Sequence, residues 1–212
     1  MKKNFDKGPR IIGLTGMYCA GKNYVARLLE ERGLPVLDVD ALGHRAIEVE
    51  KEAIVQRFGP EILGEDGAVD RRALGTKVFG SPGELAALEE IVHPAANRLT
   101  ENWIAGITKG PCVINAALLH RSTAFSRLDF VVIVQAPLLT RLLRARRRDG
   151  LPILPLIRRF KSQRKFMSQY LSQNADIYRV NNWGYSGINS RIHKGALERR
   201  IDDILSQEGI KR

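Results

Sequence analysis

Long apolar runs, cysteines and acidic residues are all scarce in this chain of 212 residues. No apolar run approaches the ~20 residues that a membrane-spanning helix needs, so we expect no membrane partner. The basic N-terminus leads into only four apolar residues, whereas a secretory signal needs about 7–15. Two cysteines, Cys19 and Cys112, are too few for a disulfide framework. These shortages predict a protein of the reducing cytosol.

Acidic residues are outnumbered by basic ones, 23 to 34, which gives a formal net charge of +11. Between Arg141 and Lys165, eight arginines and two lysines stand against one acid, Asp149, so this segment carries +9 and the rest of the chain about +2. A basic chain raises nucleic acid as a partner. Because the charge is concentrated in one segment, it favours a local anion site, and nucleic acid is not the partner we expect.

The chain opens with the order strand, glycine loop, helix, strand, which is typical of a parallel α/β sheet. The apolar run at 10–16 is predicted as a buried strand, and a helix that ends at Gly33 follows the loop. A second short strand is predicted over 34–40. Residues 41–110 contain no convincing strand and are predicted as a mostly helical insertion, with Asp70 and Ser81 as helix caps.

Two near-continuous apolar runs, PCVINAALL and LDFVVIVQAP, then resume the sheet. The next helix is predicted to open at Pro137, to end at Gly150 and to bury one apolar face, made of Leu138, Leu139, Leu142 and Leu143. A last short strand, ADIYRVNN, and a final amphipathic helix complete the pattern.

The stretch TGMYCAGKNY has the Gly-x4-Gly-Lys spacing of a phosphate-binding loop. In such a loop, backbone N–H groups and a helix N-terminus surround phosphate oxygens, and Lys22 would reach the β- and γ-phosphates. Asn23 stands where a hydroxyl residue normally serves Mg²⁺, although its amide oxygen is also a possible ligand. We expect the helix N-terminus to lower the pKa of Cys19. An ordinary β–α turn is the alternative interpretation of the same pattern.

Asp38 and Asp40 are two residues apart and would share one face of the second strand. The end of that strand should lie beside the phosphate loop, where an aspartate can accept the proton of an attacking hydroxyl. The simpler alternative is that Asp40 only caps the following helix.

Six blocks, in order between Arg10 and Asn182, resemble the dephospho-coenzyme A kinase family. They read IIGLTGMYCAGKNYVARLLEERGLPVLDVDALGH, IVQRFGPEIL, GAVDRRALGTKVF, IVHPAA, RLLRARRRDG and ADIYRVNN. The resemblance implies an α/β P-loop kinase fold, with a five-stranded parallel sheet flanked by helices, a helical insertion and a basic lid. It also implies transfer of the γ-phosphoryl group of ATP to the 3′-hydroxyl of dephospho-coenzyme A, with Mg²⁺ as cofactor.

The same resemblance implies roles for individual residues. ATP binding falls on Gly16, Cys19, Ala20, Gly21, Lys22, Asn23 and Tyr24. Catalytic roles fall on Lys22, on Asp40 as the base and on Arg148 in the lid. Substrate binding falls on Asp40, Arg71 and His93, and any metal contact of the chain falls on Asn23. Asn23 and Arg121 depart from the family pattern, because the family has a hydroxyl residue and an acidic residue at these two positions.

The implied organisation has a nucleotide-binding core over 10–40, 111–140 and 175–208. The helical substrate domain, which binds coenzyme A, is expected over 41–110, the helical basic lid over 141–174, and a tail over 1–9. The alternatives are another small-molecule or nucleotide kinase, a nucleic-acid-binding P-loop protein, and a weakened relative that binds ATP or coenzyme A.

Overall fold

The computed structural model describes residues 8–150, 153–163, 166, 170, 175–184 and 190–210. Its contacts divide the chain into two compact units. Unit 1 comprises Met1–Leu37 and Ile107–Arg212, and unit 2 comprises Asp38–Gly106. The phosphate-loop sequence belongs to unit 1, and unit 2 overlaps most of the range 41–110 that was predicted as a helical insertion.

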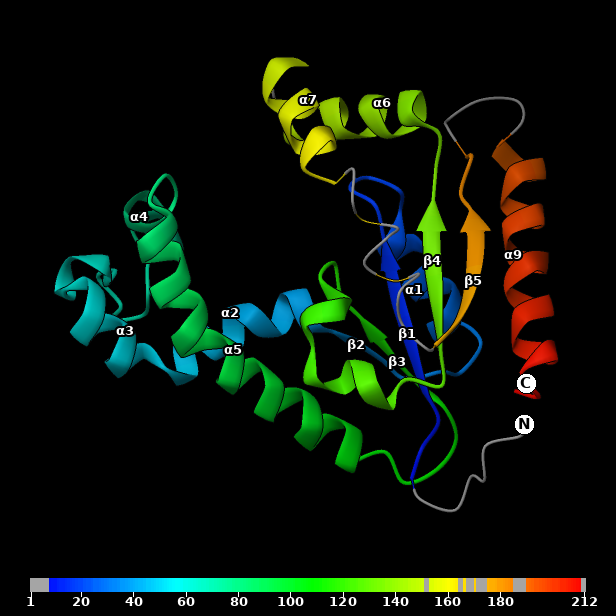
Figure 1. Cartoon of the computed structure of the whole chain (residues 1–212), viewed down its shortest axis with the longest axis horizontal. Helices are drawn as coiled ribbons and strands as arrows, with labels where there is room; N and C mark the ends of the chain where they lie inside the picture. The colour runs from blue at the N-terminus through cyan, green and yellow to red at the C-terminus, as the bar shows by residue number, and fades with distance from the viewer. Residues whose placement is uncertain are drawn as a thin grey trace. The chain divides into compact units, whose positions relative to one another are not determined.

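Unit 1 is built on a five-stranded parallel sheet in the order β2-β3-β1-β4-β5. Figure 1 shows β4 and β5 side by side, with α9 running along β5. The strands are β1 (Ile11–Gly16), β2 (Val36–Asp38), β3 (Cys112–Asn115), β4 (Phe130–Gln135) and β5 (Asp176–Asn181). The helical elements of this unit are α1 (Lys22–Glu30), η2 (Leu119–Arg121), η3 (Thr123–Arg127), α6 (Leu138–Asp149), α7 (Ile153–Ser162) and α9 (Ser190–Gln207). The predicted α/β parallel sheet is confirmed.

The central strands of the sheet are apolar because both of their faces are covered. Every residue of β1 is buried, and its register places Ile12 beside Phe130 of β4. Helices α1 and α9 contribute Leu28 and Ile201 to the same core. Gly13 is required for close packing on this strand, since a Cβ there would lie 2.7 Å from side-chain atoms of Leu119 and of Leu128.

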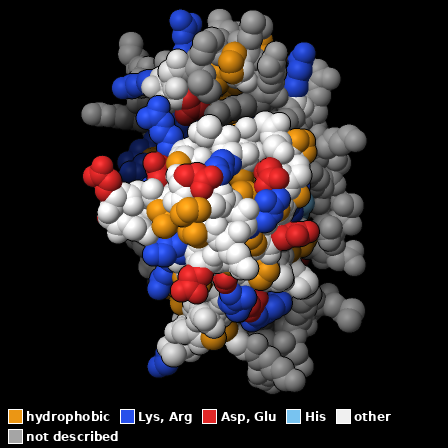
Figure 2. Space-filling view, turned by 90° about the vertical axis from the view of Figure 1, so that its left-hand side faces the viewer, with side chains coloured by type: hydrophobic (Ala, Val, Ile, Leu, Met, Phe, Trp, Pro, Cys, Tyr) orange, Lys and Arg blue, Asp and Glu red, His pale blue; other side chains and the backbone are white. Residues whose placement is uncertain are grey.

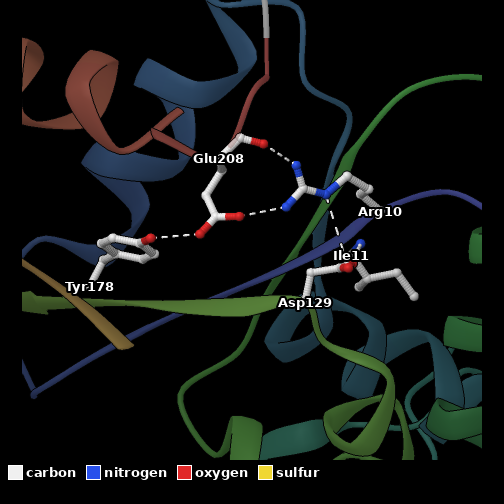
Figure 3. Close-up of polar contacts among 5 residues, drawn as sticks. All are labelled: Arg10, Ile11, Asp129, Tyr178 and Glu208. Atoms are coloured by element: carbon white, nitrogen blue, oxygen red, sulfur yellow. Dashed lines mark hydrogen bonds and ion pairs between the residues drawn. The ribbon is translucent and has the colours of Figure 1, made fainter. Parts of the chain in front are cut away.

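A polar cluster ties the C-terminal end of α9 to the start of the sheet (Figure 3). The Arg10 guanidinium pairs with the Glu208 carboxylate at 2.6 Å and also donates to the Glu208 carbonyl. The Tyr178 hydroxyl donates to the other carboxylate oxygen of Glu208 at 2.6 Å, and this bond raises the pKa of Tyr178 to about 12. Asp129 accepts a hydrogen bond from the Ile11 amide. The cluster therefore joins β1, β5, the residue that precedes β4 and the residue that follows α9.

Unit 2 is helical and has its own apolar core. Its elements are α2 (Val39–Val49), α3 (Lys51–Phe58), η1 (Pro60–Ile62), α4 (Arg71–Val78) and α5 (Pro82–Ala105). Asp70 caps α4 as predicted, because its carboxylate accepts hydrogen bonds from the amides of Arg72 and Ala73. Ser81 occupies the cap position of α5 without a capping side-chain bond.

Two local predictions are wrong. The second strand ends at Asp38, and Asp40 lies in the first turn of α2, so the two carboxylates do not share a strand face. The predicted apolar face of α6 is not buried, since Leu138, Leu139 and Leu143 are 62%, 67% and 38% exposed. The buried residues of α6 are Arg141 and Ala145, and the phosphate loop supplies a polar partner for Arg141.

The face of the molecule in Figure 2 mixes basic, acidic and hydrophobic side chains. No single sign of charge dominates that face, as expected if the excess positive charge is local. In the part of the chain that the structure describes, no helix is both long enough and apolar enough to cross a bilayer.

Candidate active site

The phosphate loop runs from the end of β1 to the start of α1. Gly21 lies in the left-handed region with φ +94°, which allows the chain to turn into the helix. Within the described ranges, the amides of Cys19, Gly21 and Asn23 donate to no other residue. Free N–H groups at a helix N-terminus form an anion site. The loop is therefore arranged as the glycine pattern predicts.

Cys19 is the one described residue other than glycine with a positive φ, +58°. This conformation costs a non-glycine residue roughly 1–2 kcal/mol, so the surrounding contacts must hold the loop in place. Burial raises the pKa of the Cys19 thiol, against the weaker opposite effect of Arg148. The predicted lowering of this pKa is therefore wrong, because desolvation outweighs the neighbouring arginines.

Arg141 of α6 lies buried against the loop. Its Nε donates to the Tyr18 carbonyl at 2.8 Å, and its Nη2 donates to Gln163 Oε1 at 3.2 Å. Its guanidinium carbon also lies 4.7 Å from the centre of the Phe160 ring. Burial lowers the pKa of Arg141, but an arginine remains charged in proteins. Among the described residues, no carboxylate forms an ion pair with it, so its positive charge adds to the anion-attracting field of the loop.

Tyr18, the bulky residue in the loop, contacts the basic helices. Its amide donates to Gln163 Oε1 at 2.8 Å, its hydroxyl donates to Asp149, and its ring meets Phe160 edge-on at 5.6 Å. The predicted lid residue Arg148 lies over the same ring at 5.1 Å and pairs with Asp149 at 2.7 Å. This hydrogen bond to Asp149 raises the pKa of Arg148. Loop, α6 and α7 thus form one connected cluster.

Asn23 is exposed at the start of α1, and its Oδ1 accepts a hydrogen bond from Asn115 Nδ2 at 3.3 Å. Asn115 ends β3 and is 1% exposed, and its Oδ1 is buried without a hydrogen-bond partner. No cluster of three His, Cys, Asp or Glu side chains suited to a metal occurs in the described ranges. Arg121 is exposed at the end of η2, in the same unit. The side-chain oxygens of Asn23 and Asn115, which adjoin each other here, are neutral amide oxygens.

A buried hydroxyl network lies behind the end of β1. Tyr170 is fully buried, and its hydroxyl lies 3.4 Å from Thr15 Oγ1 and 3.2 Å from His120 Nδ1. Burial lowers the pKa of His120, and Arg121 lowers it further. A neutral imidazole is consistent with a hydrogen bond to a phenol.

Three predicted residues belong to unit 2. Asp40 is exposed in the first turn of α2. The carboxylate of Asp38 accepts hydrogen bonds from the backbone amides of Asp40 and Ala41 at 3.1 and 3.3 Å. Asp38 is therefore the cap, and the Asp40 side chain is not used for capping. Arg71 begins α4 and lines a groove of about 700 Å³ with an apolar floor, and His93 is exposed within α5. The roles of these residues toward the loop stay predictions.

Sequence patterns missed several residues that contact the loop. Arg141 and Arg144 stand out in the sequence only as members of the basic segment, but in the structure both donate hydrogen bonds to loop carbonyls. Asn115, Gln163 and Tyr170 lie outside the blocks that carry the family resemblance, and Asn182 lies in the block ADIYRVNN without a role implied for it. Only the fold brings Asn115, Gln163 and Asn182 to the loop, and Tyr170 to the adjoining Thr15 of β1.

The comparisons with known proteins cover most of the chain. A family model described as Dephospho-CoA kinase matches residues 10–184. The chain belongs to the dephospho-CoA kinase family. The curated dephospho-CoA kinase of Treponema pallidum is 34% identical over 210 residues, which cover 94% of this chain and 96% of that protein. The dephospho-CoA kinase of Thermus thermophilus is 38% identical over 157 residues, with coverages of 74% and 76%.

Solved structures agree with this family and fold. A crystal structure from Thermus thermophilus has a TM-score of 0.74 at 34% identity and covers 95% of this chain and 98% of that one. A shikimate kinase from Bacteroides thetaiotaomicron, with a TM-score of 0.53 at 16% identity and coverages of 93% and 98%, shares the fold alone. As a member of the dephospho-CoA kinase family, the chain is an ATP-dependent kinase and a transferase. The alternatives of another kinase or a weakened relative gain no support.

Proposed function

We propose that this member of the dephospho-CoA kinase family converts dephospho-coenzyme A into coenzyme A. The 3′-oxygen of the acceptor attacks the γ-phosphorus of ATP, the bond from that phosphorus to the β,γ-bridging oxygen breaks, and ADP leaves. The observation that carries the proposal is the phosphate loop in a chain whose family match spans residues 10–184. Phosphoryl transfer depends mainly on positioning and charge stabilisation, which a preformed anion site supplies.

On the ATP side, we assign the β- and γ-phosphates to Lys22 and to the amides of the loop, from Gly16 through Tyr24. Arg148, in the predicted lid, is assigned to the same phosphates. It would exchange its partner Asp149 for phosphate oxygens. Arg–phosphate pairs are strong because their hydrogen bonds are charge-assisted. Lys22, Arg148 and the loop together would neutralise the charge that develops in the transition state.

On the acceptor side, we assign the attacking hydroxyl to Asp40, whose carboxylate would take its proton. Arg71 and His93 are assigned to the body of the acceptor. In support, Arg71 borders a groove whose floor includes Leu74 and Val78, so a cationic edge adjoins an apolar surface. Such a surface suits a substrate with a diphosphate and a long, weakly polar arm.

Magnesium would arrive with ATP. The residues present fit a weakly held ion, because the buried Asn115 Oδ1 lacks a hydrogen-bond partner and Asn23 Oδ1 is a hard oxygen donor. When bound, the ion shields the phosphate charge. Asn23 and Asn115 would hold it directly or through water, with most ligands from phosphate and solvent.

Identification of the product tests this proposal. The chain is incubated with ATP, Mg²⁺ and dephospho-coenzyme A, and the product is analysed by mass and by treatment with a 3′-specific nucleotidase. We expect an added phosphate that the nucleotidase removes. A product phosphorylated elsewhere, or no product while ATP still binds, would contradict the assignment. Because Cys19 and Cys112 are both free thiols, the assay is run under reducing conditions, as expected for a cytosolic enzyme.

A further inference from the structure

Two side chains from outside the phosphate loop hold consecutive carbonyl groups of that loop. Arg144 Nη1 donates to the Ala20 carbonyl at 3.0 Å and to the Cys19 carbonyl at 3.4 Å. Asn182 Nδ2 donates to the same Ala20 carbonyl at 2.9 Å. These are the peptide groups at which the loop turns from β1 into α1.

The planarity of the peptide bond gives these contacts a consequence. In a trans peptide, the C=O of one residue and the N–H of the next point in opposite directions. When Asn182 and Arg144 hold the Ala20 carbonyl on their side, the Gly21 amide must point to the other side. Within the described ranges this amide donates to no residue. The contact therefore fixes the direction of a donor suited to an anion.

Gly21 leaves the space that this arrangement needs. A Cβ at position 21 would lie 2.2 Å from Asn182 Nδ2, so any side chain there would displace the Asn182 amide. The φ of +94° also favours glycine. The phosphate-loop pattern specifies glycine at position 21. The φ of this residue and the closeness of Asn182 both require a glycine there.

Asn182 is itself held firmly at the end of β5. It is 7% exposed, and its backbone N–H donates to the Gln135 carbonyl at 2.7 Å. Arg144 Nη2 donates to Asn182 Oδ1 at 3.3 Å and to the Asn182 carbonyl at 3.2 Å. Because Oδ1 receives this cationic donor, Nδ2 is the atom that faces Ala20. Both ends of the side-chain amide therefore have complementary partners.

We propose that Asn182, supported by Arg144, is a positioning residue for phosphoryl transfer. It acts through the phosphate loop, by fixing the direction of the Gly21 amide before ATP arrives. The inference rests on the proposed function in one respect only, that the loop receives the phosphates of ATP. It requires no contact between Asn182 and a substrate.

The test compares Asn182→Asp with Asn181→Asp in the full chain. The two changes alter charge equally at adjacent positions, but Asn181 is exposed and Asn182 is buried. Asn182→Asp replaces the donor to Ala20 with an acceptor. Dissociation constants for ATP and for adenosine are measured by calorimetry, together with KM and kcat. Adenosine reports nucleoside binding without phosphates.

For Asn182→Asp, we expect the Kd and KM for ATP to rise about 10-fold or more, as for an unsatisfied buried polar group. The Kd for adenosine and the KM for dephospho-coenzyme A should stay unchanged, as should every constant of Asn181→Asp. Equal weakening of ATP and adenosine would reveal a general structural role and overturn the proposal. So would an ATP affinity equal to that of Asn181→Asp.

If Asn182→Asp does not fold, the dissociation constants of Arg144→Lys for ATP and adenosine test the proposal by the same criteria. Lysine keeps the charge, but its single ammonium cannot occupy both the position of Nη1 at Ala20 and the position of Nη2 at Asn182. A selective loss of ATP affinity supports the proposal, and an unselective loss or no loss overturns it. Because ATP binding needs no acceptor, these readouts remain valid even if dephospho-coenzyme A proves not to be the substrate.

Discussion

Arg141 Nε donates to the carbonyl oxygen of Tyr18 at 2.8 Å, which places a buried cation of α6 directly against the phosphate loop. Leu138, Leu139 and Leu143 of the same helix are exposed instead. The buried residues of this helix are therefore Arg141 and Ala145, while three of its leucines are exposed. A loop with polar backbone groups on its outer side binds a guanidinium better than a leucine, since buried carbonyl groups require donors.

This relationship predicts opposite sensitivities along α6. Arg141→Met should lower the free energy of unfolding by about 1–3 kcal/mol, because the Tyr18 carbonyl loses a buried donor. Leu139→Gln, at a position that is 67% exposed, should change it by less than about 0.5 kcal/mol. Urea denaturation of both variants measures the difference. A larger cost for Leu139→Gln would show that the leucines are the buried face.

Arg148 and Arg147 form a matched pair at the end of α6. Arg148→Glu should lower kcat by at least ~10-fold, since it removes a cation assigned to the transferring phosphate and introduces repulsion. Arg147→Glu, an equal charge reversal at an exposed neighbour, should leave kcat within about 2-fold. Steady-state kinetics at saturating ATP make the comparison. Equal effects of the two reversals would indicate a general electrostatic contribution rather than a lid contact.

Substitutions at Asp40 and at Asp38 should distinguish a role in proton transfer from a role in helix capping. Asp40→Asn should lower kcat at least ~100-fold, the usual size of a general-base effect, with the ATP dissociation constant unchanged. Asp38→Ala should instead cost about 1 kcal/mol of stability, because it removes the cap of α2. Kinetics and thermal unfolding of both variants test this. Nearly full turnover by Asp40→Asn would remove this residue from proton transfer.

The raised pKa of Cys19 predicts slow alkylation. Burial favours the neutral thiol, so at pH 8 iodoacetamide should react with Cys19 more slowly than with a free cysteine peptide. A Cys112→Ala background isolates the signal. Saturating ATP should slow the reaction further, because the thiol lies in the loop. Alkylation faster than that of the peptide would mean that the arginines outweigh desolvation.

Tyr178 should make stability depend on alkaline pH. Its folded-state pKa is raised to about 12 by the hydrogen bond to Glu208, while its ordinary value is about 10. The stabilisation is therefore full below pH 10 and is lost as the pH rises toward 12. The difference in unfolding free energy between the wild type and Tyr178→Phe should shrink over this interval. If the difference in unfolding free energy did not depend on pH, the hydrogen bond from Tyr178 to Glu208 would be contradicted.

The sequence predicts the sheet and the loop because their signals are local. Buried strands give continuous apolar runs, Gly21 has a positive φ, and Gly16 leaves no room for a Cβ beside the Val134 carbonyl oxygen. Arg141 and Asn182 could not be recognised in this way. Each contacts the loop across more than a hundred residues of chain, and a basic helix looks the same whether its arginines face solvent or a carbonyl. Cys19 shows a further limit, because the pKa of a thiol depends on burial that the motif does not reveal.

Acceptor specificity tests the central claim most directly. Coupled ADP-release assays give kcat/KM for dephospho-coenzyme A, adenosine monophosphate and shikimate under the same conditions, with Lys22→Ala as the loop control and Lys194→Ala, an exposed lysine of α9, as its match. We predict turnover with dephospho-coenzyme A at least ~100-fold above the other two acceptors, lost in Lys22→Ala and retained in Lys194→Ala. Preference for another acceptor, or full activity of Lys22→Ala, would contradict the account.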